Sequence, residues 1–183
     1  MMMDRRQFVT TGGLILAGLS TPLGARAQNN VVHIDMRSDE DGAEVWFDPI
    51  GVWVEPGSTI RWKIKENVHT VTAYHPDNEN RSLRIPTKAA PWDSGYLVNP
   101  GDDFEVTLNA PGVYDYFCAP HEEAGMIGRI IVGKPLGPGA QDFDYFKSLS
   151  PAPNWQSVPV VARNNFPSLD QIMLDKTVRF KPG

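Results

Sequence analysis

The chain has 183 residues, of which 41% are hydrophobic and 21% are charged. That length fits one globular domain with extensions, or at most two small domains. The formal net charge of −5 at pH 7 disfavours nucleic acid as a partner, because phosphate binding needs a basic surface. The 16 glycines and 16 prolines indicate many turns and little helix.

Residues 1–27 are typical of an export signal. A charged region containing Arg5 and Arg6 precedes a short apolar stretch, and an Ala-x-Ala cleavage motif ends at Ala27. The paired arginines resemble a twin-arginine signal. We therefore expect a periplasmic or otherwise exported protein whose mature chain begins near Gln28. Cleavage would remove three arginines and one aspartate, so the net charge would change from −5 to −7. A retained membrane anchor is the alternative, although the apolar run is short for a membrane span.

The segment from Val31 to Val132 has the pattern of an all-β domain. Apolar and polar residues alternate with a period of two in three segments, which we predict to be strands: 59–65, 104–108 and 113–118. Short strands separated by Pro-Gly turns, without amphipathic helices between them, favour a β-sandwich or barrel.

Two segments depart from this pattern. We interpret Asp77 to Gly95 as a long loop with at most one short strand. The Pro-rich tail, residues 134–183, keeps aromatic anchors, and we expect it to lie over the sandwich or against a partner. Within this tail, the sequence from Ser168 to Gln171 resembles a capping box that opens a short helix through Leu174.

Cys118 is the one cysteine of the chain. Exported proteins normally pair their cysteines, so a leftover thiol forms an intermolecular bridge, reacts, or binds a metal. Cys118, His121 and Met126 lie within nine residues directly after a predicted strand. One turning loop can direct all three side chains to a common centre. His69, at the start of another predicted strand, is the best candidate for a further ligand.

This set of donors favours one copper ion. A thiolate and two imidazoles with a weak axial thioether are the ligands of blue-copper electron-transfer sites. Zinc prefers more thiolates or imidazoles and has little use for a thioether. A thiol nucleophile with His121 as its base is an alternative, but it leaves Met126 and the strand before Cys118 unexplained.

Plainer interpretations stay open for single residues. Cys118 and Met126 could each be a core residue, and His33 and His75 compete with His69 for the remaining ligand position. We prefer His69 because a strand position beside the thiolate suits the geometry. We interpret Glu122 and its neighbour Glu123 as solvated charges on the rim of the loop.

The stretch from Tyr114 to His121, followed by Ala124 to Gly128, resembles the copper loop of plastocyanins. The Cys-x2-His-x4-Met spacing is also that of pseudoazurins and halocyanins. The resemblance covers roughly 45–133, about half of the chain. It implies an all-β cupredoxin fold, a Greek-key sandwich of about eight strands in two sheets, here with an irregular Pro-rich C-terminal extension.

The resemblance also implies roles for single residues. His69, Cys118 and His121 would be the strong copper ligands and Met126 the weak axial one. The backbone amide of Thr70 would donate a hydrogen bond to the Cys118 sulfur. The family's plant members have a tyrosine just before the cysteine that serves a second docking site. Phe117 occupies that position in this chain, which puts a second docking site for electron transfer in doubt.

The resemblance implies one-electron transfer between redox proteins, such as a cytochrome, an oxidase or a reductase, without catalysis. We expect a signal at 1–27, a plastocyanin-like copper domain at 28–133 and an extension at 134–183, without stable membrane insertion after signal cleavage. Two alternatives remain: a copper-binding module (store, chaperone or sensor) and the electron-entry subunit of a larger oxidoreductase.

Overall fold

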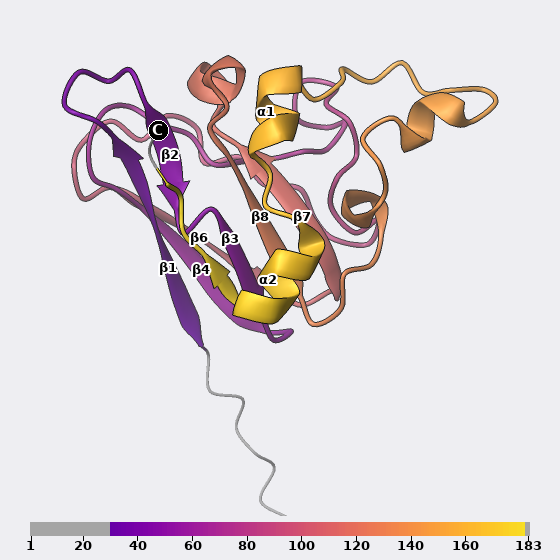
Figure 1. Cartoon of the computed structure of the whole chain (residues 1–183), viewed down its shortest axis with the longest axis horizontal. Coiled ribbons are helices and arrows are strands. Elements are labelled where there is room, and N and C mark those ends of the chain that lie inside the picture. The colour runs from indigo at the N-terminus through magenta and orange to yellow at the C-terminus, as the bar shows by residue number, and fades with distance from the viewer. Residues whose placement is uncertain (1–29, 182–183) are drawn as a thin grey trace, which may run out of the picture.

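The computed structural model describes residues 30–181. The predicted export signal at 1–27 and the start at Gln28 therefore lie outside the described residues. Within them, the chain forms nine strands: β1 (Val31–Ser38), β2 (Val45–Asp48), β3 (Gly51–Val54), β4 (Ser58–Ile64), β5 (Thr72–Ala73), β6 (Asp103–Leu108), β7 (Gly112–Phe117), β8 (Ile127–Val132) and β9 (Thr177–Val178). Short 3₁₀ helices lie at η1 (Ala119–Ala124), η2 (Pro138–Ala140) and η3 (Tyr145–Ser148). Two α-helices follow, α1 (Val160–Asn165) and α2 (Leu169–Asp175) (Figure 1).

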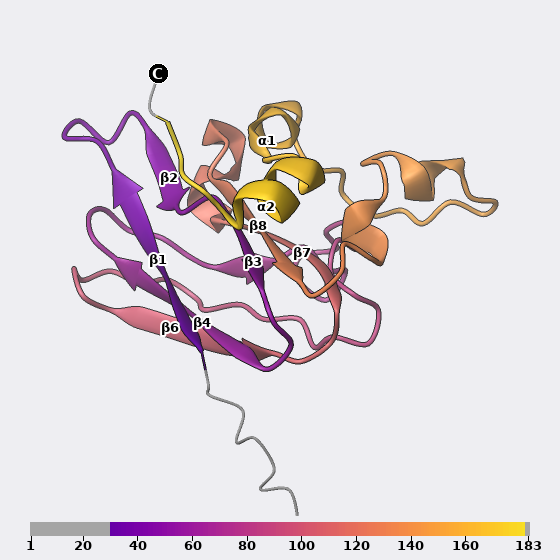
Figure 2. The ribbon, with the colours of Figure 1, turned by 60° about the horizontal axis from the view of Figure 1, so that its bottom comes forward.

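The strands form two sheets. One has the order β2-β1-β4-β6, and the other has the order β5-β7-β8-β3-β9. The β1–β4 and β3–β8 pairs are parallel, and the other pairs are antiparallel. Figure 2 shows the two sheets as stacked layers, with α1 and α2 as a third layer on the outer face of the five-stranded sheet. The predicted cupredoxin β-sandwich is confirmed, and its ninth strand comes from the C-terminal extension.

The three predicted strands are confirmed to within one residue at each end, as β4, β6 and β7. The predicted loop over 77–95 forms two isolated bridges, Thr72 with Asp93 and Arg81 with Gln156, and no strand of its own. The second of these bridges ties the loop to the C-terminal extension. No helix among residues 30–181 combines the length and the hydrophobicity needed to cross a bilayer.

The main core fills the space between the two sheets. Trp62 of β4 is fully buried there and makes an edge contact with the ring of Tyr116 from β7, with 5.3 Å between the ring centroids. Tyr114, Tyr116, Cys118 and Met126 all belong to this cluster. The predicted shared face of Tyr114, Tyr116 and Cys118 is therefore the face that looks into the sandwich.

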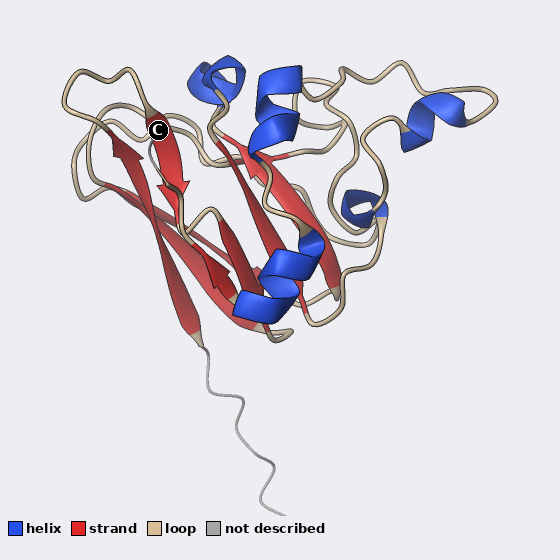
Figure 3. Ribbon diagram, in the orientation of Figure 1, coloured by secondary structure: helices blue, strands red, loops and turns tan. Residues whose placement is uncertain are grey.

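Strands β7 and β8 are buried along their whole length, which a sheet with one solvated face would not allow. Val113 and Phe117 on β7 and Ile131 on β8 point away from the sandwich into a second apolar cluster. Ile172 of α2 contributes to that cluster. The expectation that the tail lies over the sandwich is confirmed, and Figure 3 shows both α-helices on this one face.

A buried ion cluster on the same outer face holds the extension. Asp115 of β7 accepts hydrogen bonds from Arg84 and from its cross-strand partner Arg129 of β8. Arg84 also donates to the carbonyls of Gly139 and Gln141, at 2.8 Å in each case. The two arginines thus link a carboxylate of the sheet to the backbone of the extension.

Helix α2 begins as predicted. Ser168 is its N-cap, and the Ser168 hydroxyl accepts a hydrogen bond from the Gln171 amide at 3.1 Å. The helix ends at Asp175, one residue beyond the predicted Leu174. Helix α1 was not predicted, because its sequence begins with two valines after Pro159 and offers no side-chain cap.

Candidate metal centre

The register of β5 against β7 brings the predicted ligands together. Thr72 pairs with Phe117 in an antiparallel ladder, so residues just before β5 lie beside residues just after β7. His69 precedes β5 and exchanges two backbone hydrogen bonds with Leu97. Cys118 follows β7 directly, and His121 lies in η1. These three residues come from segments 49 positions apart in the chain.

The donor atoms of these residues converge. The Sγ of Cys118 lies 3.6 Å from the Nδ1 of His69 and 3.4 Å from the Nδ1 of His121. All three ligand atoms lie within 4.8 Å of one another. Bonds of about 2.3 Å to sulfur and 2.0 Å to imidazole, as in zinc sites, would separate sulfur and nitrogen by roughly 3.5–3.8 Å around one ion. The observed spacing therefore fits a single first-row metal ion.

Burial sets the protonation of the three groups. Cys118 and His69 are fully buried, whereas His121 is partly exposed. Desolvation raises the pKa of the Cys118 thiol to about 11. Desolvation and the neighbouring His121 lower the pKa of His69 to about 4, and desolvation also lowers that of His121. Both imidazoles are thus neutral near pH 7, and a bound cation would compensate a buried thiolate.

Thr70, two residues before β5, supports the sulfur of Cys118. Its backbone amide donates to the Sγ of Cys118 at 3.3 Å, as the sequence resemblance implied. Its hydroxyl accepts a hydrogen bond of 2.7 Å from the amide of Ala119, the residue after the cysteine. The same side chain therefore fixes the start of the metal-binding loop, and hydrogen bonds of this kind orient ligands and tune the metal.

Met126 closes the loop that begins at Cys118. The Cys118 amide donates to the Met126 carbonyl at 3.0 Å, and the Met126 amide donates to the His121 carbonyl at 3.1 Å. The Met126 side chain is fully buried in the same apolar cluster as Cys118. Its role as the axial ligand stays a prediction.

The two competing histidines lie elsewhere. His33 is on β1 of the opposite sheet, where it pairs with Arg61. His75 lies after β5, and its Nδ1 accepts a hydrogen bond from the Asp77 amide. Of the three histidines weighed for the second imidazole, His69 is the one that the fold brings to Cys118.

The interpretation of Glu122 as a solvated rim charge was wrong. Glu122 is 2% exposed, and its carboxylate accepts a hydrogen bond of 2.7 Å from the hydroxyl of Tyr74. It also pairs with Arg81 at 2.6 Å. Burial raises the pKa of Glu122, while Tyr74 and Arg81 act in the opposite direction. Glu123 is exposed, as predicted.

Sequence reasoning missed the Tyr74–Glu122–Arg81 cluster because its members come from three separate segments with no shared motif. Phe117 packs beneath this cluster. Its ring lies 4.5 Å from that of Tyr74, and the Arg81 guanidinium lies 5.0 Å from its centroid. The side chain that replaces the family's tyrosine is therefore fully buried.

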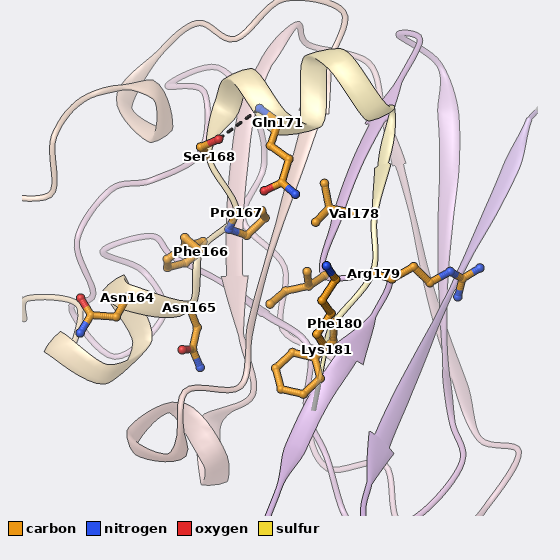
Figure 4. Close-up of a pocket in the computed structure, with 11 residues that line it drawn as sticks. Asn164, Asn165, Phe166, Pro167, Ser168, Gln171, Val178, Arg179, Phe180 and Lys181 are labelled. Atoms are coloured by element: carbon orange, nitrogen blue, oxygen red, sulfur yellow. Dashed lines mark hydrogen bonds between the residues drawn. The ribbon is translucent and has the colours of Figure 1, made fainter. Parts of the chain in front are cut away.

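A hollow of about 380 Å³ lies where the extension meets the sheet, between the segment that joins α1 to α2 and the segment around β9. Asn164, Asn165, Gln171 and Arg179 are among its lining residues (Figure 4). The four predicted copper ligands are not among them.

Comparison with known proteins gives one family. The model of copper binding proteins of the plastocyanin/azurin family matches residues 33–133, more than half of the chain. A chloroplastic plastocyanin of Tetradesmus obliquus is 29% identical over 66% of this chain and 77% of its own length. Plastocyanin A'/A'' of Nicotiana tabacum is 29% identical over 55% of this chain and 99% of its own length.

Solved structures agree on the fold. The pseudoazurin of Methylobacterium extorquens AM1 aligns with 80% of this chain and 98% of its own, with a TM-score of 0.51 and 23% identity. Together with the two imidazoles and the thiol at metal-binding distances, the family match indicates that the site holds a single copper ion.

Proposed function

The chain belongs to the plastocyanin/azurin family of copper-binding proteins, and on this basis we propose that it carries single electrons between redox proteins outside the cytoplasm. His69, Cys118 and His121 would be the strong ligands of a type 1 copper centre, and Met126 the weak axial ligand. The observation that carries this proposal is the convergence of two Nδ1 atoms and one Sγ atom within 4.8 Å.

Copper in such a site supplies a reversible one-electron couple, Cu(II)/Cu(I). The remaining task of the chain is to keep the ligands in place. Backbone hydrogen bonds hold Cys118, His121 and Met126 in one closed loop. A second set, from Thr70, holds the sulfur and the loop start. A framework of this kind limits rearrangement between the two oxidation states, which favours rapid electron exchange.

His121 is the proposed route for the electron. It is partly exposed, whereas His69, Cys118 and Met126 are buried. An electron could therefore reach the metal through the imidazole of His121 without any substrate entering the site. This arrangement favours an electron carrier over an enzyme.

The organisation of the chain and its location belong to the same proposal. We propose a twin-arginine export signal at 1–27, a copper domain at 28–133 and an extension at 134–183 that folds onto that domain. The acidic mature chain suits a basic redox partner such as a cytochrome, an oxidase or a reductase. The pairing of β9 with β3 and the shared cluster around Ile172 support folding of the extension with the domain.

Visible absorption and electron paramagnetic resonance of the copper-loaded chain 28–183 test the proposal. We expect an intense thiolate-to-copper band and a narrow copper hyperfine splitting, both lost in Cys118→Ser. Stopped-flow mixing with a cytochrome should then show reversible one-electron exchange. A pale Cu(II) spectrum that Cys118→Ser leaves unchanged would contradict the site and the electron-transfer role together.

The alternatives give different results. A copper store or chaperone would lose its copper readily to a chelator of moderate affinity, whereas an electron carrier would retain it. An electron-entry subunit would bind its oxidoreductase through the extension, so Tyr145→Ala and Leu149→Ala, at exposed residues of the extension, would weaken binding. Retained copper and unchanged partner binding in these two variants would favour the diffusible carrier.

A further inference from the structure

The peptide group between Gly125 and Met126 is held from two sides. Its N–H, which belongs to Met126, donates to the His121 carbonyl at 3.1 Å within the copper loop. Its carbonyl, which belongs to Gly125, accepts a hydrogen bond of 3.0 Å from the Nδ2 of Asn165. Asn165 is the last residue of α1, in the extension. One contact is thus internal to the copper loop, and the other comes from outside it.

Close packing accompanies the hydrogen bond. Gly125 is buried and has a φ of +84°, a conformation that favours glycine. A Cβ at this position would lie 2.3 Å from the Nδ2 of Asn165 and 3.2 Å from a methyl carbon of Val161. Helix α1 therefore approaches the loop so closely that only a glycine fits between them.

The sheet fixes the position of Asn165. The two residues that follow it, Phe166 and Pro167, both contact Arg129 of β8. The guanidinium lies 4.7 Å from the centroid of the Phe166 ring and donates to the Pro167 carbonyl at 3.0 Å. Arg129 is in turn bound to the buried Asp115. A chain of contacts thus runs from the sheet through the extension to the peptide before Met126.

We propose that Asn165 is a positioning residue of the copper centre, which fixes the peptide before Met126 and thereby the approach of the Met126 thioether to the metal. The inference rests on the proposed function, since it takes Met126 as the axial ligand. The strength of the axial ligand tunes the reduction potential of such a site. The C-terminal extension would then adjust the potential without supplying any ligand.

The test uses the copper-loaded chain 28–183 with Asn165→Leu, which keeps the side-chain shape and removes the amide donor. Asn165→Ala removes the donor without adding a charge. Asn164→Leu is the control, because Asn164 is the exposed neighbour on the same helix. Figure 4 shows the Asn164 and Asn165 side chains pointing in different directions.

Spectroelectrochemistry and electron paramagnetic resonance give the readouts, with the unfolding of the copper-free protein measured in parallel. We expect both Asn165 variants to stay blue and to shift the midpoint potential upward, in the same direction as Met126→Leu, because a less constrained thioether stabilises Cu(II) less. Asn164→Leu should keep the wild-type potential. In a Met126→Leu background, Asn165→Leu should shift the potential no further.

Other outcomes overturn the inference. Blue Asn165 variants with the wild-type potential and spectrum, even if less stable, would leave Asn165 a packing residue while the electron-transfer role stood. An equal shift in Asn164→Leu, or a shift by Asn165→Leu that persists without Met126, would exclude action through the thioether. A wild-type protein without the thiolate-to-copper band would remove the proposed function and this inference together.

Discussion

The carboxylate of Asp115 lies directly opposite Arg129 on the β7–β8 ladder, with its Oδ1 2.7 Å from the Arg129 Nε. Its Oδ2 accepts a hydrogen bond from Arg84 at 3.0 Å. All three side chains are buried, and both arginines also bind carbonyls of the extension. A single carboxylate thus pairs with two buried guanidinium groups that attach the tail to the sheet.

Asp115→Asn should therefore destabilise the copper-free protein by about 3–5 kcal/mol, because two buried guanidinium groups lose their counter-charge. Urea denaturation monitored by tryptophan fluorescence measures the loss. Glu105→Gln, which breaks the exposed Arg61–Glu105 pair, is the matched control and should leave the midpoint unchanged. Equal stability of Asp115→Asn and wild type would contradict a structural role for the cluster.

Helix α2 allows a comparison of two aliphatic side chains in one element. Ile172 is fully buried against the sheet, whereas Leu174 is 81% exposed. Ile172→Ala should cost about 2–4 kcal/mol through lost burial and a residual cavity. Leu174→Ala should change the free energy of unfolding by less than about 0.5 kcal/mol. Similar midpoints for both variants in urea would mean that the extension adds little to the stability of the domain.

Thr70 joins the two segments that carry the proposed ligands. Thr70→Val keeps the side-chain shape but removes the oxygen that accepts the Ala119 amide. We expect a loss of about 1–2 kcal/mol in the copper-free protein from the unsatisfied amide, and faster copper loss to a chelator. The Thr70 amide that donates to the Cys118 sulfur is retained, so the protein should stay blue. Thr107→Val, at the Thr59–Thr107 contact of the other sheet, controls for the loss of a hydroxyl.

Glu122 and Glu123 are adjacent in the chain but differ in burial. Glu122→Gln removes the charge that faces Arg81 in the buried cluster and should lower the free energy of unfolding by about 1–3 kcal/mol. Glu123→Gln, at the exposed neighbour, should have no measurable effect. Thermal unfolding of the two copper-free variants, followed by circular dichroism, makes the comparison. A larger loss for Glu123→Gln would disprove the assigned roles.

Local patterns in the sequence were sufficient for several features. The alternation in 59–65 and 104–108 predicted strands because a half-buried sheet imposes a period of two on its residues. Ser168 and Gln171 predicted the start of α2, because a cap depends on residues three positions apart. The copper loop could also be predicted from the sequence, since Cys118, His121 and Met126 lie within nine residues of one another.

Other features depended on contacts between distant segments. Glu122 resembles Glu123 in sequence, and only the approach of Tyr74 and Arg81 distinguishes the buried residue from the exposed one. Helix α1 has no capping signal and weak helical propensity, and it forms where Ala162 is buried against the sheet. The contact of Asn165 with Gly125 spans 40 residues and has no local pattern at all.

Local sequence patterns were enough to predict an all-β domain and a loop that suits copper, because strand periodicity and the softness of Cys118, His121 and Met126 are properties of neighbouring residues. Contacts between distant segments place His69, and not His33 or His75, beside Cys118, because the register of β5 on β7 sets that distance. They also place the extension over β7 and β8 and against the copper loop, because the buried Asp115 cluster and the apolar outer face of the sheet hold it there.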